Sequence, residues 1–316
     1  MGLRPGNGTC LFRELLMGST NTVFGFDIVA PFSLRTARTG DNGDRLFVEM
    51  AEVEGFESGP PIISWQPGPD NPLDATLRER PTGGYVLDII DAGTYLVEPL
   101  SSRITIPVMP DIPLREIRLL GLPLLLCFLA RGDISLHGAA VMGPTGAIVL
   151  AAPGRHGKTS LAAMLTRLGY RLLTEDLCCI RTGKESLLFP GPASLRVRPD
   201  MAGHVLPLDG MAEIGTIDDR VVLAATDPGD GQPVPVAGIV LLKGFDDEVS
   251  LVELDPVDSL SDLWLLSFHL PTEADRAHKF TQLVDLVGSV RMWELTQAND
   301  RGAVGLSAEK LMAAVV

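Results

Sequence analysis

The chain has 316 residues, of which 46% are hydrophobic and 21% are charged, so it can bury a substantial core and is not a disordered protein. Its 40 acidic residues outnumber its 26 basic residues, and the formal net charge of −14 argues against nucleic acid or an anionic membrane as a partner. This length allows one large domain or two of ordinary size.

The sequence predicts a cytoplasmic protein. The segment Met1–Asn7 lacks the apolar core of a signal peptide, and the most apolar segment, Leu119–Ala130, is too short to span a bilayer. The four cysteines show no metal-binding spacing and suggest no disulfide framework. Cys178 and Cys179 are adjacent on a predicted strand, so we expect them to face opposite sides as small buried side chains.

Residues 1–112 are predicted to form a β-rich accessory domain. Apolar-alternating or β-branched runs are separated there by turn-forming Gly, Pro, Asn and Asp residues. The expected strands are Thr22–Ala30, Arg45–Val53, Pro61–Gln66, Gly84–Ile90, Thr94–Pro99 and Arg103–Val108. None of these runs carries a catalytic motif, so a scaffold or a partner surface is the expected role.

Residues 113–316 are predicted to form an α/β domain, which a leucine-rich helical pattern over Pro113–Ala130 joins to the first. The expected strands are Ile134–Met142, Ala147–Ala152, Arg171–Glu175, Leu177–Arg181, Ser186–Phe189, Val236–Leu242 and Val249–Leu254. The expected helices are Lys158–Leu168, Ser259–Leu266, Glu273–Val287 and Ala308–Val315. The Asp- and Gly-rich segment Asp209–Gln232 predicts a mobile loop region.

The strongest functional signal is a predicted strand, turn and helix centred on Gly157-Lys158-Thr159. Backbone N–H groups of such a loop and the positive end of the next helix converge on phosphate oxygens. Lys158 would add a charge to the terminal phosphates, and the Thr159 hydroxyl would hold Mg²⁺. Ala152 stands where the usual spacing has its first glycine. The residues expected to contact the nucleotide are Gly154, Arg155, His156, Gly157, Lys158, Thr159 and Ser160.

A second element, the adjacent carboxylates Glu175 and Asp176, follows the next predicted strand. A metal-bridged phosphoryl site needs carboxylates at a strand end beside a phosphate loop. The alternative is a charged strand end exposed to water. Together the two elements favour a site for ATP or a related nucleotide.

Three further residues are candidates, each with a structural alternative. His137 precedes a glycine that permits close backbone approach, and a site role and a structural role are equally open. Arg196 and Arg198 alternate on one face of an extended segment, where they could clamp a phosphate or an acidic substrate. A solvated edge strand explains the two arginines as well.

In order and spacing, these motifs resemble the catalytic domain of HPr serine kinases. The segments that carry the resemblance are Leu136-His137-Gly138-Ala139, the apolar strand, Gly157-Lys158-Thr159-Ser160, and Gly169-Tyr170 through Glu175-Asp176. The chain is most similar to the shorter relatives of these kinases, including those encoded with lasso-peptide and other peptide-modification genes. The resemblance implies the phosphoenolpyruvate-carboxykinase type of P-loop domain, preceded here by the β-rich domain.

The resemblance also implies a reaction, the Mg²⁺-dependent transfer of the terminal phosphoryl group of ATP to a serine hydroxyl of a peptide or small protein. A ribosomal precursor peptide, such as a lasso precursor, is one expected acceptor. Lys158 and the loop would hold the phosphates, with His137 nearby. Thr159 and Asp176 would bind Mg²⁺, and Glu175 would act as the base. Glutamate replaces the family's aspartate at that position and shifts the carboxylate by about 1 Å, a displacement that can cost on the order of 10²-fold in rate.

Two other functions are open at this stage. Arg155 and His156 depart from the small residues of the family loop, so the protein could instead bind a nucleotide with weak or no transfer and act as a regulatory or interaction protein. It could also be a kinase of small molecules. Neither nucleic acid nor membrane is an expected partner, and a homo-oligomer is left open.

Overall fold

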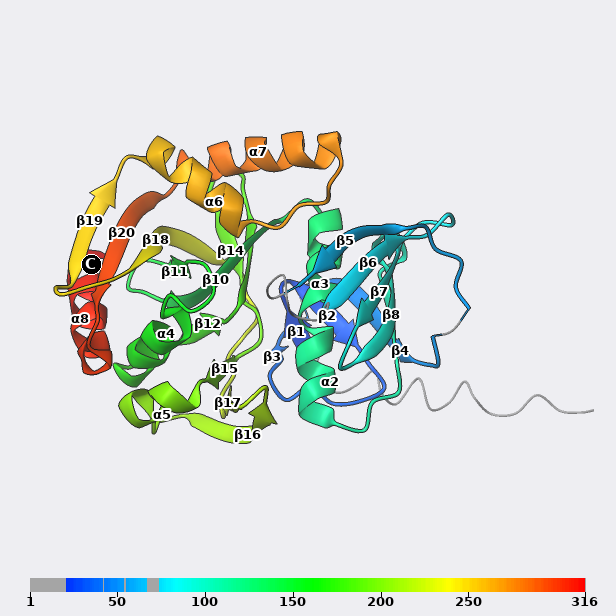
Figure 1. Cartoon of the computed structure of the whole chain (residues 1–316), viewed down its shortest axis with the longest axis horizontal. Coiled ribbons are helices and arrows are strands. Elements are labelled where there is room, and N and C mark those ends of the chain that lie inside the picture. The colour runs from blue at the N-terminus through cyan, green and yellow to red at the C-terminus, as the bar shows by residue number, and fades with distance from the viewer. Residues whose placement is uncertain (1–20, 42, 54, 67–73, 316) are drawn as a thin grey trace, which may run out of the picture.

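The protein has two lobes that lie side by side, as the computed structural model shows for residues 21–41, 43–53, 55–66 and 74–315 (Figure 1). The expectation about Met1–Asn7 lies outside these described residues. Within them, no helix has both the length and the apolar character that crossing a membrane requires.

The N-terminal lobe is built on one nine-stranded sheet. Its strands are β1 (Asn21–Val23), β2 (Phe26–Val29), β3 (Arg38–Thr39), β4 (Asp44–Met50), β5 (Pro61–Trp65), β6 (Ala75–Glu79), β7 (Tyr85–Ile89), β8 (Gly93–Glu98) and β9 (Arg103–Ile106), with the 3-10 turn η2 (Pro99–Ser101) before β9. The order across the sheet is β3-β1-β2-β4-β9-β8-β7-β6-β5. The pairs β2–β4 and β4–β9 are parallel and the others are antiparallel.

The prediction of one strand over Thr22–Ala30 is wrong, because this segment is a hairpin. Phe24 and Gly25 have φ values of 53° and 72°, and Val23 pairs with Phe26 across them. Two consecutive residues with positive φ form the turn that matches the twist of a tight hairpin. The strands β3 and β6 were not predicted.

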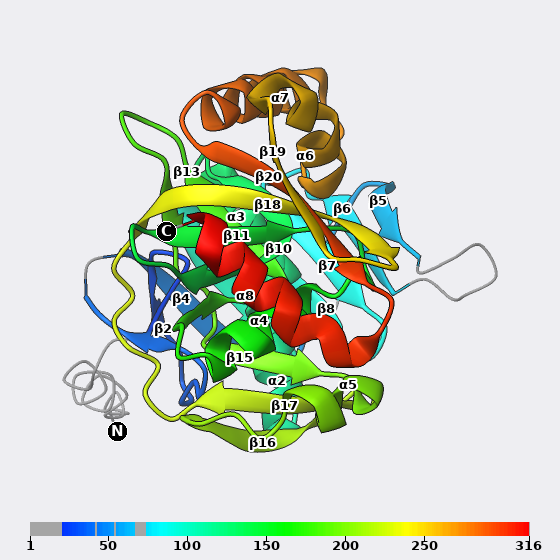
Figure 2. The same cartoon turned by 90° about the vertical axis from the view of Figure 1, so that its left-hand side faces the viewer.

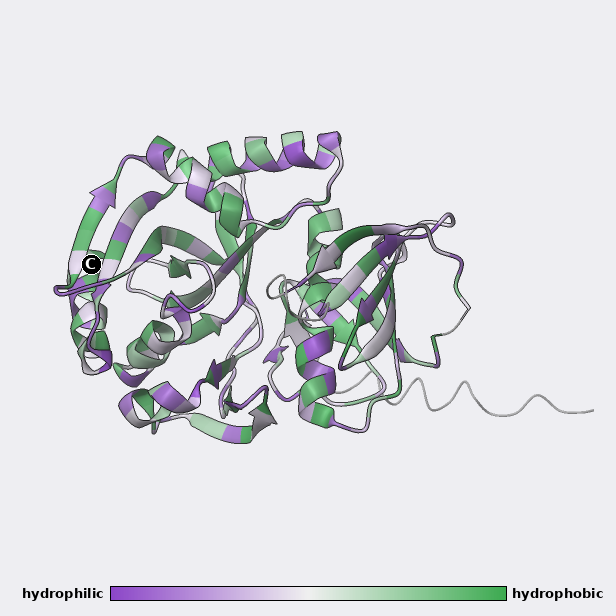
Figure 3. Ribbon diagram, in the orientation of Figure 1, coloured by the Kyte–Doolittle hydropathy of each residue, from purple (hydrophilic) through white to green (hydrophobic). Residues whose placement is uncertain are grey.

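Two helices, α2 (Ile112–Leu119) and α3 (Leu122–Ala130), occupy the leucine-rich segment. The α3 helix is apolar on nearly all sides (Figure 3), as expected for a fully enclosed helix. It contacts β8 in one lobe and β10 in the other. Residues of both helices share one hydrophobic core with the first sheet. The domain division between residues 112 and 113 remains a prediction, and this packing would move it to about Arg131.

The C-terminal lobe contains a sheet of eight strands. They are β10 (Ile134–Met142), β11 (Ala147–Ala151), β12 (Leu172–Thr174), β13 (Leu177–Arg181), β14 (Leu187–Phe189), β18 (Val234–Asp246), β19 (Ser250–Leu254) and β20 (Arg291–Ala298). The strands β11-β10-β13-β14-β18 form a closed path because β11 also pairs in parallel with β18. From β18 the sheet continues through β20 to β19, and β12 pairs with β10.

Helices cover both sides of this sheet (Figure 2). They are α4 (Lys158–Arg167), α6 (Leu260–Leu266), α7 (Glu273–Val287) and α8 (Val304–Val315), with the 3-10 turns η3 (Pro256–Ser259) and η4 (Arg301–Ala303) before α6 and α8. Ile148 and Leu150 of β11 pack in the core with α4 and α8, whereas Val149 packs with α6 and α7. A strand buried on both faces reads as a continuous apolar run, which is why β10 and β11 were predictable. The chain has a mixed α/β fold.

The prediction of a mobile loop over Asp209–Gln232 is wrong. A three-stranded sheet, in the order β15-β17-β16, includes β16 (Met211–Ile217) and β17 (Arg220–Ala225) from this segment and β15 (Ser194–Val197) from the preceding one. Asp218 and Asp219, with φ values of 50° and 59°, form the tight turn between β16 and β17. The short helix α5 (Pro199–Val205) follows β15.

A buried arginine of the first lobe, Arg38 on β3, enters the second lobe and is only 1% exposed. Its Nη2 donates to the carbonyl oxygens of Leu172 and Leu173, each at 2.8 Å, and its Nε donates to that of Gly191 at 3.0 Å. Its Nη1 donates to the carbonyl of Pro228. Arg38 therefore joins β3 to β12, the strand that precedes the carboxylate pair.

Candidate functional site

Lys158 is the first residue of α4 and is 8% exposed. Its Nζ donates to the carbonyl oxygens of Ala152 at 2.8 Å and Pro153 at 2.9 Å, and it lies 2.9 Å from Nε2 of His137. Burial lowers the pKa of Lys158 from 10.5 to about 8, although the nearby charges of Asp176 and Glu175 act in the opposite direction. The ammonium group is therefore held close to the loop in a partly desolvated position.

The conformation of the loop before α4 is fixed by its backbone and by a neighbouring strand. Arg155 and Gly157 have φ values of 67° and 83°. A Cβ atom on Gly157 would lie 2.6 Å from Nε2 of Gln297, so a larger residue has neither the conformation nor the space. Gln297, buried on β20, donates to the carbonyl of His156 at 2.9 Å. Gly157 is the N-cap of α4, and no side chain caps this helix. The first N–H groups of α4 therefore face the loop, as an anion site requires.

The loop and the carboxylate pair are directly connected. Thr159 Oγ1 donates to Oε1 of Glu175 at 2.7 Å. Glu175 follows β12, and its side chain is 7% exposed. The hydroxyl of Thr159 and one carboxylate are therefore adjacent, which is the arrangement that a shared Mg²⁺ ion needs.

Arg196 on β15 faces both carboxylates. Its Nη2 lies 2.8 Å from Oδ2 of Asp176, and its Nε lies 3.4 Å from Oε2 of Glu175. Burial alone would raise the pKa of Asp176, but the positive charges, that of Arg196 above all, bring it below its ordinary value. Asp176 has a φ of 74°, and 48% of its side chain is exposed. Asp176 therefore combines an unfavourable backbone conformation with a half-exposed side chain that pairs with Arg196.

His137 links Lys158 to the carboxylate pair. Burial and then the charge of Lys158 lower the pKa of His137, so the ring is neutral at pH 7. Since Lys158 donates to Nε2, the proton of the ring belongs on Nδ1, which lies 3.2 Å from the carbonyl oxygen of Asp176. A Cβ atom on Gly138 would lie 2.7 Å from the carbonyl oxygen of Leu150, which confirms the close backbone approach expected beside His137.

Two further arginines share the face of the small sheet that carries Arg196. The register pairs Val197 with Val221, which places Arg198 opposite Arg220 one step further along. Burial, followed by the positive charges of Arg196 and Arg198, lowers the pKa of Arg220. The two carboxylates counteract this shift. Arg220 was not a candidate from sequence, because it lies in the segment predicted to be a loop.

The structure brings together six of the twelve predicted site residues, namely His137, Lys158, Thr159, Glu175, Asp176 and Arg196. Thr159, His137 and Arg196 contact the carboxylate pair directly, and Lys158 is connected to it through His137. The remaining candidates lie around this group without such a contact. Gly154 accepts from Nδ1 of His156 at 2.9 Å, Arg155 is exposed, Ser160 lies half-buried in the first turn of α4, and Arg198 is the N-cap of α5.

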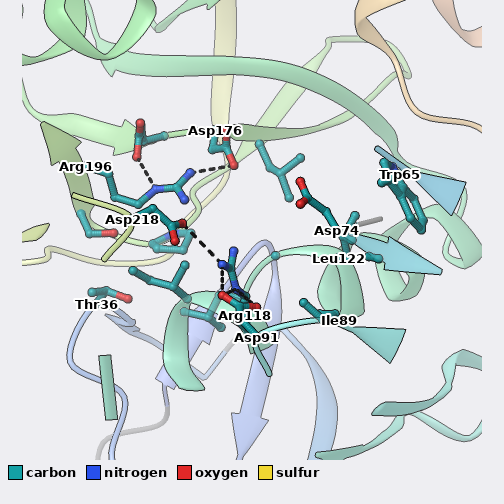
Figure 4. A pocket seen from close by; sticks show the side chains of 18 of the residues that line it. Thr36, Trp65, Asp74, Ile89, Asp91, Arg118, Leu122, Asp176, Arg196 and Asp218 are labelled. Carbon is teal, nitrogen blue, oxygen red and sulfur yellow. Dashed lines mark hydrogen bonds and ion pairs between the residues drawn. The ribbon is translucent and has the colours of Figure 1, made fainter. Parts of the chain in front are cut away.

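A cavity of about 560 Å³ lies between the lobes and ends at Glu175, Asp176 and Arg196 (Figure 4). Most of its other lining residues come from the N-terminal lobe, including Trp65, Asp74, Ile89 and Arg118, and Asp218 lines it from the tip of the β16–β17 turn. Nothing in the sequence pointed to the contribution of the first lobe, because none of these residues belongs to a motif.

The residues around Thr159 suit Mg²⁺ and ATP. In the part of the chain that the structure describes, no group of three or more His, Cys, Asp or Glu side chains is arranged to hold a metal ion. Mg²⁺ needs no such cage, since it usually takes one or two carboxylates together with substrate phosphates. The oxygens of Thr159 and Glu175, beside the ammonium of Lys158 and an uncapped helix N-terminus, provide this kind of site.

Comparisons with known proteins leave the family open. No family model matches the chain, and no curated protein matches it. Among solved structures, the chain is similar to the HPr(Ser) kinase/phosphatase from Coxiella burnetii, over 57% of this chain and 94% of that one, at 10% sequence identity and a TM-score of 0.31. A similarity at this TM-score carries no argument about function, which therefore rests on the residues of the chain itself.

Proposed function

We propose that the protein is an ATP-dependent kinase that transfers the terminal phosphoryl group of Mg-ATP to a serine hydroxyl of a peptide or small protein. The observation that carries this proposal is the contact of Thr159 with Glu175 at 2.7 Å, because it joins the loop to the carboxylate pair. Phosphoryl transfer depends mainly on charge neutralisation and on an oriented nucleophile. Both requirements have candidates within this one group of residues.

The phosphates would bind to the loop N–H groups and to Lys158, and Thr159 with a carboxylate would hold Mg²⁺. When bound, Mg²⁺ neutralises the phosphate charge and helps to orient the terminal phosphoryl group. Arg196 supplies a second fixed positive charge beside the reacting group, and His137 keeps Lys158 in place from the other side.

The environments of the two carboxylates favour a division of roles opposite to the one implied by the resemblance. Glu175 is 7% exposed and accepts the Thr159 hydroxyl, so it belongs on the metal side. Both carboxylates line the cavity, but Asp176 is 48% exposed and is therefore the more accessible base. In the reaction, the serine oxygen forms a bond to the terminal phosphorus as the bond to the β-phosphate oxygen breaks. The serine proton passes to the carboxylate, and ADP leaves.

The test is mass spectrometry of candidate acceptor peptides after incubation with Mg-ATP, together with nucleotide affinity. With Asp176 as the base, Asp176→Asn should lower the transfer rate by about 10²-fold or more and leave ATP affinity nearly unchanged. Glu175→Gln should weaken Mg-ATP binding as well. If Glu175→Gln loses transfer but keeps full ATP affinity, Glu175 and not Asp176 is the catalytic base. Nucleotide binding without any phosphorylated product would exclude a kinase.

Two alternatives have a specific observation in their favour. The guanidinium of Arg196 pairs with both carboxylates and offsets one of their two negative charges, which reduces their demand for a metal ion and favours a nucleotide-binding regulatory protein with little transfer. A cavity of about 560 Å³ is within the usual range for small-molecule sites, which favours a small-molecule kinase. The same assay, extended to free serine and other hydroxyl metabolites, separates these alternatives from the peptide kinase.

A further inference from the structure

We propose that the cavity between the lobes is the acceptor site, and that it binds a peptide segment in which the serine lies next to a bulky apolar residue and a basic residue. This inference rests on the proposed function, since it takes the Asp176 end of the cavity as the place of phosphoryl transfer. It assigns to the N-terminal lobe the selection of the acceptor.

The position of the cavity supports this role. Glu175, Asp176 and Arg196 form one end, so a group bound in the cavity reaches the carboxylates without crossing the phosphate loop (Figure 4). The far end is formed by the N-terminal lobe, at Trp65 and Ile89. A segment that places its serine at Asp176 must therefore lay its neighbouring residues against the first lobe.

The far wall is apolar and preorganised. The ring of Trp65 is stacked on Phe268 of the second lobe, with centroids 5.7 Å apart and an interplanar angle of 18°. Ile89 and Leu122 line the cavity beside it, and Ile90 at its edge is 68% exposed. A fixed aromatic ring with aliphatic neighbours gains free energy by covering an apolar side chain of a ligand.

The charges on the walls select a basic neighbour. Five carboxylates and two guanidinium groups line the cavity, a net charge of −3. Arg118 forms ion pairs with Asp91 and with Asp218 (3.4 Å), and Arg196 pairs with Glu175 and Asp176.

Asp74 is the wall carboxylate that has no cationic partner in the part of the chain that the structure describes. It is exposed and, among the described residues, has no ion pair or side-chain hydrogen bond. In Figure 4 it lies between Asp176 and Trp65. A lysine or arginine of the acceptor would provide the missing positive charge.

Three fluorescein-labelled decapeptides test the inference. The first contains one serine flanked by leucine and arginine, the second has glutamate in place of the arginine, and the third has glycine in place of the leucine. Binding is measured by fluorescence anisotropy in Mg-ADP, which makes the readout independent of transfer. We expect the first peptide to bind at least about tenfold more tightly than either of the others.

Two variants and two matched controls locate the binding site. Asp74→Lys should lower the affinity for the arginine peptide by about tenfold or more and raise the affinity for the glutamate peptide. Ile90→Asp should remove the preference for the leucine peptide over the glycine peptide. Asp258→Lys and Leu100→Asp change exposed residues outside the cavity, Leu100 being 96% exposed, and should leave both preferences unchanged.

The outcomes separate the acceptor site from the proposed function. Equal binding of the three peptides, no binding of any of them, or preferences that Asp74→Lys leaves intact would overturn the acceptor site, even if peptides are phosphorylated. The predicted binding pattern without phosphoryl transfer by the wild-type protein would instead overturn the kinase and leave a peptide-binding cavity.

Discussion

Replacing Lys158 with methionine should abolish nucleotide-dependent activity and at the same time stabilise the unliganded protein. Activity should be lost because the positive charge on the terminal phosphates disappears. Stability should rise because the fold holds this ammonium group in a buried position that lowers its pKa to about 8. A functional charge that is unfavourable in the free protein is expected where binding energy from a ligand offsets its burial.

The size of the effect follows from the pKa. A fall from 10.5 to about 8 corresponds to about 3 kcal/mol of unfavourable free energy for the charged lysine in the folded state. The penalty is full below pH 8, where Lys158 is charged in both states. It fades between pH 8 and pH 10.5, where the folded protein has lost the proton and the unfolded chain still binds it. Methionine also loses the hydrogen bonds to Ala152, Pro153 and His137, at roughly 0.5–1 kcal/mol each, so we expect a net gain of about 1 kcal/mol or less.

The assay is urea unfolding of the wild-type and Lys158→Met proteins at pH 7 and at pH 10.5, together with the transfer assay. Lys184→Met, which changes an exposed lysine, is the control and should alter neither stability nor activity. The reasoning is refuted if Lys158→Met is less stable than the wild type at pH 7, or if its gain does not shrink at the higher pH. Retained activity would refute the site itself.

Three other predictions concern Arg196, Arg38 and the charge of Lys158. Arg196→Gln should lower the transfer rate by about 10²-fold and raise the pKa of Asp176, which a shift of the acidic limb of the pH–rate profile toward higher pH would show. Arg38→Met should lower the free energy of unfolding by about 2 kcal/mol or more, measured in urea, because buried carbonyl groups lose their donors. Nucleotide affinity, measured by titration with a fluorescent ATP analogue, should fall as the pH rises through about 8, because Lys158 loses its charge there. Lys158→Met should lack this dependence.

The parts of the fold that the sequence predicts well are those in which local pattern and burial coincide. Both faces of β11 are buried, so its segment is apolar throughout, and α7 was predicted with its correct bounds, Glu273–Val287. The small sheet was missed because Arg196 and Arg198 alternate with apolar residues in a way that also suits a solvated edge. The sequence around Asp218 does not differ from that of an ordinary loop, and the hairpin is identified only by the strands that pair on either side of it.

In the candidate site, too, some residues are identified by a local sequence pattern and others only by the tertiary structure. Lys158, Thr159 and Glu175 lie within a short stretch of chain, and their spacing is sufficient to group them. Gln297 and Arg38 act on that stretch from far away in the sequence, through a loop carbonyl and through the carbonyls of β12. A single side chain that bonds to backbone leaves no pattern in the sequence around it, so only tertiary structure identifies such residues.

The insertion of Arg38 into the second lobe also limits how the protein can be divided. Cutting the chain near Arg131 would remove the donor to four backbone carbonyls of the second lobe and expose the surface that α3 covers on β10. The C-terminal half is therefore a poor candidate for expression as a free-standing catalytic module or for grafting onto another protein. A chimera that exchanges the acceptor-facing walls while keeping β3 and α3 preserves the attachment on which the carboxylate strand depends.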